Sequence, residues 1–541
     1  MRYITPDDRN QLQANIVCLD DLIEDNNMVR VIDFFVDNLD LVFHGFTKSK
    51  PKRKGRKPYN PKDMLKLYLY GYLNKIDSSR KLEAESKRNI EVKWLLGNLT
   101  PDFKTIADFR KDNRDKLKEV FKEFTFILKN AKLLDFELTA IDGSLFSAVN
   151  HNAKNYSKSK LKKLMDKLDK QIDSYLNSLS SMDNTEFNRK IDLSEKLSKL
   201  KEEQRKYQFL LERMKETGES QISLTDPDSK MMHKPKSKTD VSYNVQTAVD
   251  SKHKLISEFE VTNDCNDAKQ LSNISGKVME THNLDSLRVV ADSGYFSGEE
   301  LAKSQEMNVE TFVSEKKNDR SDRKGIFSSR HFKYDKENDV YICPLGKELP
   351  YSSTDKKYGS RVYGNTGVCR GCENLVNCAS KSSSCRRIYR SQYADIVEKQ
   401  KIINKKNRDI IESRKMIVEH PFGTIKSAMG IDRFLTKGLE SVNGEFSIIA
   451  LAFNFKRAFN ILGFNGLMEA IQSYYSAQKQ DKSLIISFFL KIMHFFRFLE
   501  KIKASKVILK ILPMKAELNF SHRLFAGLRG QYVFHPTQNF F

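Results

Sequence analysis

Residues 241–262 read VSYNVQTAVDSKHKLISEFEVT, two runs rich in Val, Ile and Phe that flank a short polar turn. Such runs predict an antiparallel β-hairpin, because β-branched and aromatic residues favour a pleated sheet. Three further apolar runs predict strands, DFELTAID at 135–142, LRVVAD at 287–292 and VETFVS at 309–314. Helical patterns at about 266–280 and at 298–307 separate the later strands. The order β–β–β–α–β–α–β is typical of an α/β domain with one mixed sheet.

Two of these strands are expected to end in a carboxylate, Asp142 in IDGSLF and Asp292 in ADSGYFS. A glycine follows each aspartate within two residues and allows a sharp turn there. Ligands of open α/β sheets bind at such strand ends. A third carboxylate, Glu419, lies in VEHPFGTIKSAMG. Taken singly, each of the three can also be a turn or capping residue.

Three clustered carboxylates repel one another unless a cation compensates their charge. Two Mg²⁺ or Mn²⁺ ions, which prefer hard oxygen ligands, would do so. Set roughly 3.5–4 Å apart, such ions activate a water or a 3′-hydroxyl and stabilise the leaving oxygen of a phosphodiester. Asp142, Asp292 and Glu419 therefore indicate metal-dependent phosphoryl transfer on nucleic acid.

Lys426 follows Glu419 by seven residues, nearly two helical turns, so the two side chains can share a helix face. There the lysine can hold a DNA phosphate beside the metals. Pro421 implies that the helix either begins near Glu419 or is kinked there. A solvated surface lysine is the alternative.

The first 130 residues are predicted to be mostly helical. Pro61 is expected to open one helix, and Thr100 and Pro101 to begin another that includes the basic residue Arg110. The basic loop at 48–57 supplies further candidate DNA contacts: Lys52, Arg53, Lys54, Arg56 and Lys57. Short helices with basic faces suit a helix-turn-helix contact with DNA. A helical packing or oligomerisation domain is the alternative.

Two segments interrupt the α/β pattern. Heptad-spaced apolar residues at 158–217, broken at 180–188, predict a helical hairpin. Residues 318–400 are polar and contain four cysteines that can form a tetrahedral zinc site: Cys343, Cys369, Cys372 and Cys378. Free thiols are the alternative. Three arginines beside this cluster are candidates for DNA contact: Arg386, Arg387 and Arg390.

The chain has 541 residues and a formal net charge of +22, from 93 Lys and Arg against 71 Asp and Glu. This excess favours a polyanionic partner, with nucleic acid as the first candidate. The first ten residues contain no apolar run, and the apolar stretch at 484–499 carries Lys491, His494 and Arg497. We therefore expect neither a secretory signal nor a membrane span. The seven cysteines do not form the pattern of a secreted disulfide framework.

Several long segments, in order over about 40–460, resemble the DDE transposases of bacterial insertion sequences, specifically the group named after insertion sequence eleven-eighty-two. RKPYNPKDMLKLYLYGYLNKIDSSRKLE with NIEVKWLLGNLTPDFKTIADFR resembles the N-terminal domain of the family. AIDGSLFSAVN, VVADSGYFS and VEHPFGTIKSAMG resemble its three catalytic segments. DPDSKMMHKPKSKTDVSYNVQTAVDSKHKLI resembles its second and third strands.

The resemblance implies an RNase H-like α/β core with the catalytic triad Asp142, Asp292 and Glu419, followed by Lys426. Many relatives carry an arginine four positions before the glutamate. Here that position is Lys415, preceded by Arg414, and both are candidate DNA contacts. The implied organisation is a DNA-binding domain at 1–130, a catalytic domain at 131–462 with insertions at 155–220 and 318–400, and a tail of unassigned role at 463–541.

The implied activity is that of an insertion-sequence transposase. It would bind terminal inverted repeats, cleave double-stranded DNA at the element ends and join the 3′-hydroxyls to target DNA. The expected cofactors are two Mg²⁺ or Mn²⁺ ions and a structural Zn²⁺. The expected assembly is a homodimer on DNA in the bacterial cytoplasm, at the nucleoid. The alternatives are a DNA-binding protein without strand transfer and a metal-dependent nuclease.

Overall fold

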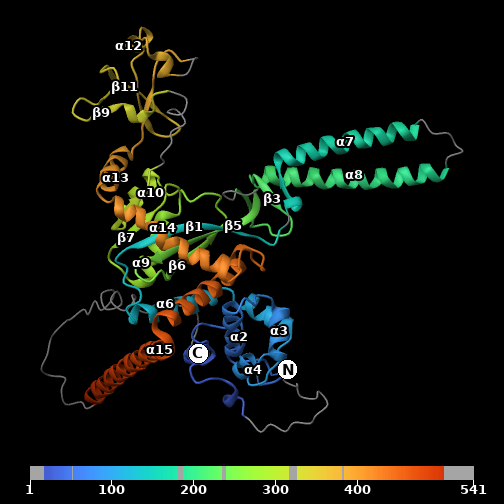
Figure 1. Ribbon diagram of the computed structural model, residues 1–541, viewed down its shortest axis with the longest axis vertical. Coiled ribbons are helices and arrows are strands. Elements are labelled where there is room, and N and C mark those ends of the chain that lie inside the picture. Colours follow the sequence, from blue (N-terminus) through green and yellow to red (C-terminus); the bar gives the residue numbers. More distant parts are fainter. Residues whose placement is uncertain are drawn as a thin grey trace, which may run out of the picture.

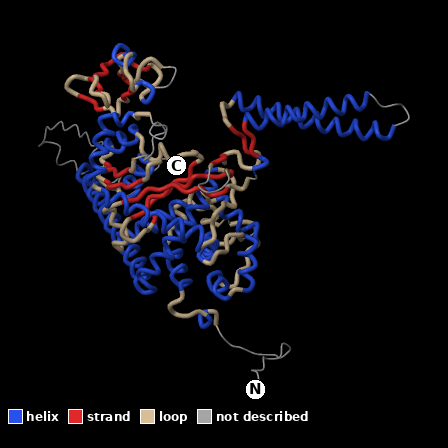
Figure 2. The backbone as a smooth tube through the Cα atoms, turned by 45° about the horizontal axis from the view of Figure 1, so that its top comes forward, coloured by secondary structure: helices blue, strands red, loops and turns tan. Residues whose placement is uncertain are grey.

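The computed structural model describes residues 18–51, 53–55, 57–150, 152–180, 187–233, 239–315, 326–379 and 383–504. A mixed sheet lies at the centre of the molecule, with helices packed around it (Figure 1). A helical hairpin and a small second sheet project from this body in different directions (Figure 1). Figure 2 shows the small sheet as a separate cluster of strands away from the central ones.

The central sheet has six strands in the order β4-β5-β1-β7-β8, with β6 paired to β5. Its strands are β1 (Thr139–Ser147), β4 (Lys230–Met232), β5 (Asp240–Asp250), β6 (Ile256–Thr262), β7 (Leu287–Ala291) and β8 (Val309–Val313). β1 is antiparallel to β5 and parallel to β7, so the sheet is mixed, as predicted. The hairpin predicted at 241–262 is present as β5 and β6.

The prediction that the first strand ends at Asp142 is wrong. β1 continues to Ser147, because its pairing with β5 runs without interruption from Thr139↔Asp250 to Ser147↔Ser242. Gly143 pairs with Gln246 inside this ladder and makes no turn. Asp142 instead lies where the pairing of β1 with its parallel neighbour β7 stops, one residue after Ile141↔Ala291.

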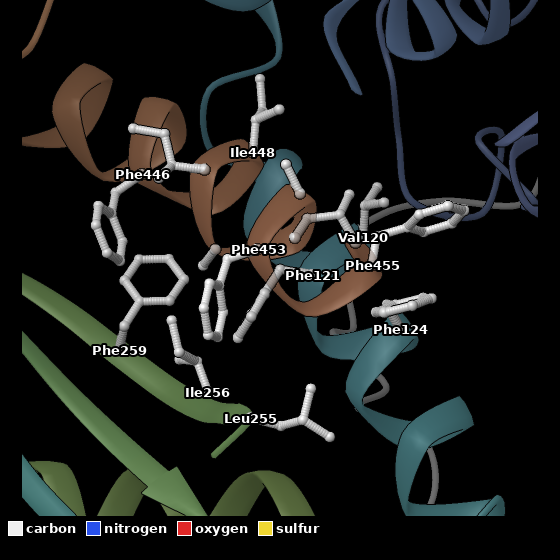
Figure 3. Packing of buried hydrophobic residues seen from close by; sticks show 14 of the residues in the cluster. Val120, Phe121, Phe124, Leu255, Ile256, Phe259, Phe446, Ile448, Phe453 and Phe455 are labelled. Atoms are coloured by element: carbon white, nitrogen blue, oxygen red, sulfur yellow. The ribbon is translucent and has the colours of Figure 1, made fainter. Parts of the chain in front are cut away.

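Several helices pack on and beside the sheet: α9 (Leu271–His282), α10 (Gly298–Glu306), α13 (Ala394–Lys406), α14 (Arg408–Gly423) and α15 (Leu439–Ala504). α14 packs on β1 and β7. α15 joins the sheet to the N-terminal helices, since Phe446 packs on Phe259 of β6 and Phe455 stacks on Phe124 of α6 (Figure 3). Burial of these rings fixes the N-terminal region against the α/β core.

Six helices form the N-terminal region: α1 (Met28–Asn38), α2 (Pro61–Leu73), α3 (Ser79–Arg88), α4 (Ile90–Leu96), α5 (Phe103–Asp112) and α6 (Leu117–Asn130). Pro61 opens α2, as predicted. α2 is buried almost all round rather than on one side. The expected start at Thr100 and Pro101 is wrong, because Asp102 caps α5 by accepting the Thr105 N–H at 2.9 Å.

The predicted hairpin consists of α7 (Lys158–Ser180) and α8 (Phe187–Glu216), which run side by side (Figure 1). Its base is closed by the strand pair β2 (Asn155–Ser157) and β3 (Gln221–Ser223). The helices meet through apolar residues that include Leu161, Leu168 and Tyr207. In the second helix Leu210 is more deeply buried than its neighbour Leu211.

The cysteine-bearing insertion contains a five-stranded antiparallel sheet that its polar sequence did not predict. Its elements are β9 (Lys333–Asp335), β10 (Val340–Ile342), β11 (Glu348–Asp355), β12 (Ser360–Tyr363), α12 (Thr366–Arg370) and β13 (Ile388–Arg390). Phe332, Tyr341 and Tyr363 are central to its small core.

The last described helix, α15, extends well past position 462 and is interrupted by Gly463, which has a φ of 69°. Among the described residues, no helix is both long enough and apolar enough to cross a membrane.

Candidate active site

Asp142 and Asp292 are brought together by the parallel pairing of β1 and β7, since both follow the last paired residues, Ile141 and Ala291. Burial raises the pKa of Asp142 to about 6, the nearby Arg414 guanidinium opposes this rise, and the negative charge of Asp292 adds to it. The site therefore holds two neighbouring carboxyl groups, one of them partly withdrawn from water and close to an arginine.

Asp292 is held by the turn that follows β7. Its Oδ1 accepts the Gly294 N–H at 2.7 Å, and its carbonyl oxygen accepts the Tyr295 N–H at 3.2 Å. The predicted sharp turn is thus present after Asp292. The Tyr295 side chain is fully buried, and its hydroxyl donates to Gln246 Oε1 on β5. The turn is therefore anchored to the sheet.

Arg414 supplies a positive charge at the site. It lies on α14, one turn before the buried residues Ile417 and Val418. Its Nη1 lies 3.2 Å from Asp142 Oδ1, an ion-pair distance. Arg414, expected to contact DNA, therefore pairs with Asp142. The neighbouring Lys415 is exposed.

Glu419 is exposed on α14, and no contact among the described residues joins it to Asp142 or Asp292. Lys426 reaches β1, where its Nζ donates to Ser144 Oγ at 2.6 Å and to Leu145 O at 2.8 Å. α14 begins at Arg408 and passes through Pro421, so of the two alternatives, a helix start or a kink near Glu419, the helix start is wrong. A π-helical turn at Thr424–Ala428 follows and carries Lys426, and such turns recur at functional sites.

The chemistry of these side chains fits divalent metal ions. Asp142 and Asp292 offer hard oxygen donors, and burial, together with the negative charge of Asp292, raises the pKa of Asp142. Among the described residues, no three His, Cys, Asp or Glu side chains are already gathered closely enough to hold an ion. Asp142 and Asp292 are thus neighbours, and Glu419 is not gathered with them.

The family models match two long segments of the chain. Residues 17–112 match a family described as a transposase domain (DUF772), and residues 213–455 match the transposase DDE domain. The chain is a DDE transposase of the insertion-sequence type. No curated protein matched its sequence. A cryo-EM structure of a piggyBac transposase synaptic complex with hairpin DNA is similar at 10% identity and a TM-score of 0.30, covering 91% of this chain and 86% of that chain.

In this transposase three of the four candidate zinc ligands, Cys343, Cys369 and Cys378, pack against the core of the small sheet. Among the described residues, the four cysteines do not form a group gathered closely enough to hold a metal ion. Burial raises the pKa of the Cys378 thiol, and Arg386 opposes this rise. Arg390 is only 7% exposed and is paired with Asp395 and Glu398, so it is not available to DNA.

The basic residues of the N-terminal region differ in their surroundings. Arg53, Lys54 and Lys57 are exposed. Arg110 is 8% exposed, and its Nη1 lies 3.0 Å from the Tyr72 hydroxyl and 3.6 Å from Glu445 Oε1. Arg110 therefore joins the N-terminal region to α15 rather than facing DNA. Lys52 and Arg56 lie outside the described residues.

Asp267, which no sequence pattern indicated, is a carboxylate beside the segments that follow Asp142 and Asp292. A Cβ on Gly143 would lie 2.7 Å from Asp267 Oδ1, and a Cβ on Gly294 would lie 3.4 Å from Asp267 Oδ2. The available sequence signal was the glycine close after each of these two aspartates, which marks a place where another group approaches the backbone. This signal did not reveal which group.

Proposed function

We propose that this transposase binds the terminal inverted repeats of its element, cleaves DNA at the element ends and joins the 3′-hydroxyls to target DNA. The observation that carries the proposal is the pair of half-buried carboxylates Asp142 and Asp292, which directly follow the last paired residues of the parallel strands β1 and β7. The strand order β6-β5-β1-β7-β8, antiparallel in its first three strands, supports an RNase H-like core.

Asp142 and Asp292 would hold two Mg²⁺ or Mn²⁺ ions, and Glu419 would complete the second site. When bound, such ions lower the pKa of an attacking water or hydroxyl and stabilise the leaving oxygen. Lys426, fixed to β1 two residues beyond Asp142, would position a phosphate of the DNA. Arg414 would balance the carboxylate charge until metal binds.

The DNA surface would include Arg53, Lys54 and Lys57 of the basic loop and Lys415 of α14, all exposed. A net charge of +22 favours this partner. Because two element ends must be processed, the working form would be a homodimer on DNA, in the cytoplasm at the nucleoid. Light scattering that showed one protein molecule holding both ends would contradict the dimer.

The direct test uses linear DNA that carries the gene's own flanks, incubated with Mg²⁺ or Mn²⁺. Wild-type protein should cut at discrete flank ends and transfer them to a target plasmid, whereas Asp292→Asn should bind the same DNA without cutting. Asp292→Asn keeps an oxygen that can accept the Gly294 N–H, so its fold is expected to persist. Binding without cutting by the wild type would contradict the proposal.

Cys343, Cys369, Cys372 and Cys378 would hold a structural Zn²⁺. Metal analysis of the purified protein should then find one zinc per chain. The Cys372→Ser variant should lose it, and Cys18→Ser, at an exposed cysteine outside the insertion, should retain it. Zinc-free wild-type protein with four reactive thiols in the insertion would contradict this assignment.

A further inference from the structure

Asp267 lies in the segment between β6 and α9 and is bound by neutral amides of β5. Its Oδ1 accepts from Asn244 Nδ2 at 2.8 Å and from Gln246 Nε2 at 2.6 Å. Gln246 in turn accepts the Tyr295 hydroxyl. Asn244 is 2% exposed, and Gln246 and Tyr295 are fully buried. One hydrogen-bonded chain thus runs from Asp267 through β5 to the turn that carries Asp292.

The same carboxylate occupies the space beside both catalytic segments. A Cβ on Gly143 would lie 2.5 Å from Gln246 Nε2 and 2.7 Å from Asp267 Oδ1, closer than atoms can approach. A Cβ on Gly294 would lie 3.4 Å from Asp267 Oδ2. Asp267 is therefore in reach of the backbone directly after Asp142 and of the turn after Asp292.

Successive residues of a strand point to opposite faces of the sheet. The Asp142 side chain meets Arg414 on one face, and the bare side of Gly143 meets Asp267 on the other. Asp267 thus supports the strand from behind the catalytic carboxylate. A neutral side chain of the same shape could also accept from the two amides, so hydrogen bonding alone does not require a charge here.

We propose that Asp267 is a positioning residue, which fixes β1 at Gly143 against the turn at Gly294 and so sets the separation of the Asp142 and Asp292 carboxylates. Its negative charge, which lies on the face of β1 opposite to the Asp142 carboxylate, also favours the binding of divalent metal ions. The inference rests on the proposed function, since it concerns the same metal site. Residues that orient metal ligands in this way typically affect metal affinity or activity by 10–100-fold.

The test compares Asp267→Asn, which keeps the shape and removes the charge, with Asp267→Ala, which removes both. Asp264→Asn is the matched control, because Asp264 lies on the same segment but is exposed and bonded to Gln270 at 2.6 Å. Three quantities are measured for each full-length variant: the rate of flank cleavage, the Mn²⁺ concentration for half-maximal thermal stabilisation, and DNA binding without metal.

Asp267→Asn should cleave roughly 10–100-fold more slowly and need about tenfold more Mn²⁺ for the same thermal shift. Its metal-free melting temperature and DNA affinity should match the wild type. Asp267→Ala should be slower still, and Asp264→Asn should behave as wild type. The proposal would be overturned if both Asp267 variants responded to Mn²⁺ as the wild type does. It would also be overturned if the variants lost metal-free stability and DNA binding to the same extent as cleavage, because such a loss marks a purely structural role.

The metal-induced thermal shift separates this inference from the proposed function. Absence of flank cleavage by the wild type would count against the transposition chemistry, while the Mn²⁺ response would still report on Asp267. Normal wild-type cleavage together with unchanged Asp267 variants would overturn the role of Asp267 alone.

Discussion

The segments that carry Asp142 and Asp292 have similar sequences but hold their aspartates differently. Asp142 lies within a strand that continues for five residues, to Ser147, whereas Asp292 lies in a turn that begins as β7 ends. Gly143 is needed because Gln246 and Asp267 fill the space beside it, and Gly294 because a Cβ there would lie 2.9 Å from Asp292 Oδ1. A glycine near a candidate catalytic acid therefore does not by itself imply a turn.

The largest expected effect is the loss of catalysis when either carboxylate is neutralised. Asp142→Asn and Asp292→Asn should each slow flank cleavage by roughly 10³-fold or more, because each removes an ionic metal ligand while keeping the side-chain shape. Gel assays of cleavage, with binding measured in parallel, test this. If one variant retained near wild-type cleavage, the two segments would not share one site.

The half-buried Asp142 should make metal-free stability depend on pH. Its folded pKa of about 6 lies above the ordinary value of 3.8, so the unfolded chain releases its proton first as pH rises. The free energy of unfolding, relative to Asp142→Asn, should fall between about pH 4 and pH 6, by on the order of 2–3 kcal/mol. Urea unfolding with a chelator measures this. Parallel pH curves for the two proteins would contradict the raised pKa.

The two glycines should respond differently to an added methyl group. Gly143→Ala places a Cβ 2.5 Å from Gln246 Nε2 and should lower the free energy of unfolding by about 1–3 kcal/mol. In Gly294→Ala the added Cβ would lie 2.9 Å from Asp292 Oδ1. The main expected effect is therefore a slower cleavage, because the Asp292 carboxylate is displaced. Urea unfolding and cleavage rates distinguish the two. Equal stability losses would argue against different roles.

The smallest effects are expected at neighbouring residues of α14. Arg414→Ala removes the charge that opposes the rise of the Asp142 pKa, so the acid limb of the cleavage rate should move to higher pH. Lys415→Ala should leave that acid limb unchanged. It should reduce the slope of log binding constant against log salt concentration by about the amount that one phosphate contact contributes. A pH shift in Lys415→Ala but not in Arg414→Ala would reverse these assignments.

The sequence predicted most of the sheet because its strands are short runs of Val, Ile and Phe bounded by polar turns. It also placed Asp142 and Asp292 at strand ends, whereas the adjacency of the two strands comes from the structure. It did not predict that β1 passes through Asp142, because that depends on the register with Gln246, which is distant in sequence. The small sheet at 333–390 was missed because its short strands are largely polar.

The candidate site was predicted less completely than the fold. Arg414 was assigned to DNA contact because the family places an arginine four positions before the glutamate, which is position 415 here, next to Arg414. The structure shows that the packing of Ile417 and Val418 decides which face of α14 meets Asp142. Arg110 was assigned by charge alone, and its burial against Glu445 depends on contacts between distant helices. Asp267 has no local sequence pattern, since amides on another strand bind it.

Crystals soaked with Mn²⁺ and measured for anomalous scattering would test the site most directly. Anomalous peaks should lie within coordination distance of both Asp142 and Asp292, with the Arg414 guanidinium moved away from Asp142. In Asp142→Asn crystals the peaks should weaken or disappear. An unchanged Arg414–Asp142 pair, with no peak between the two aspartates at saturating Mn²⁺, would contradict the assignment of this pair as the catalytic metal site.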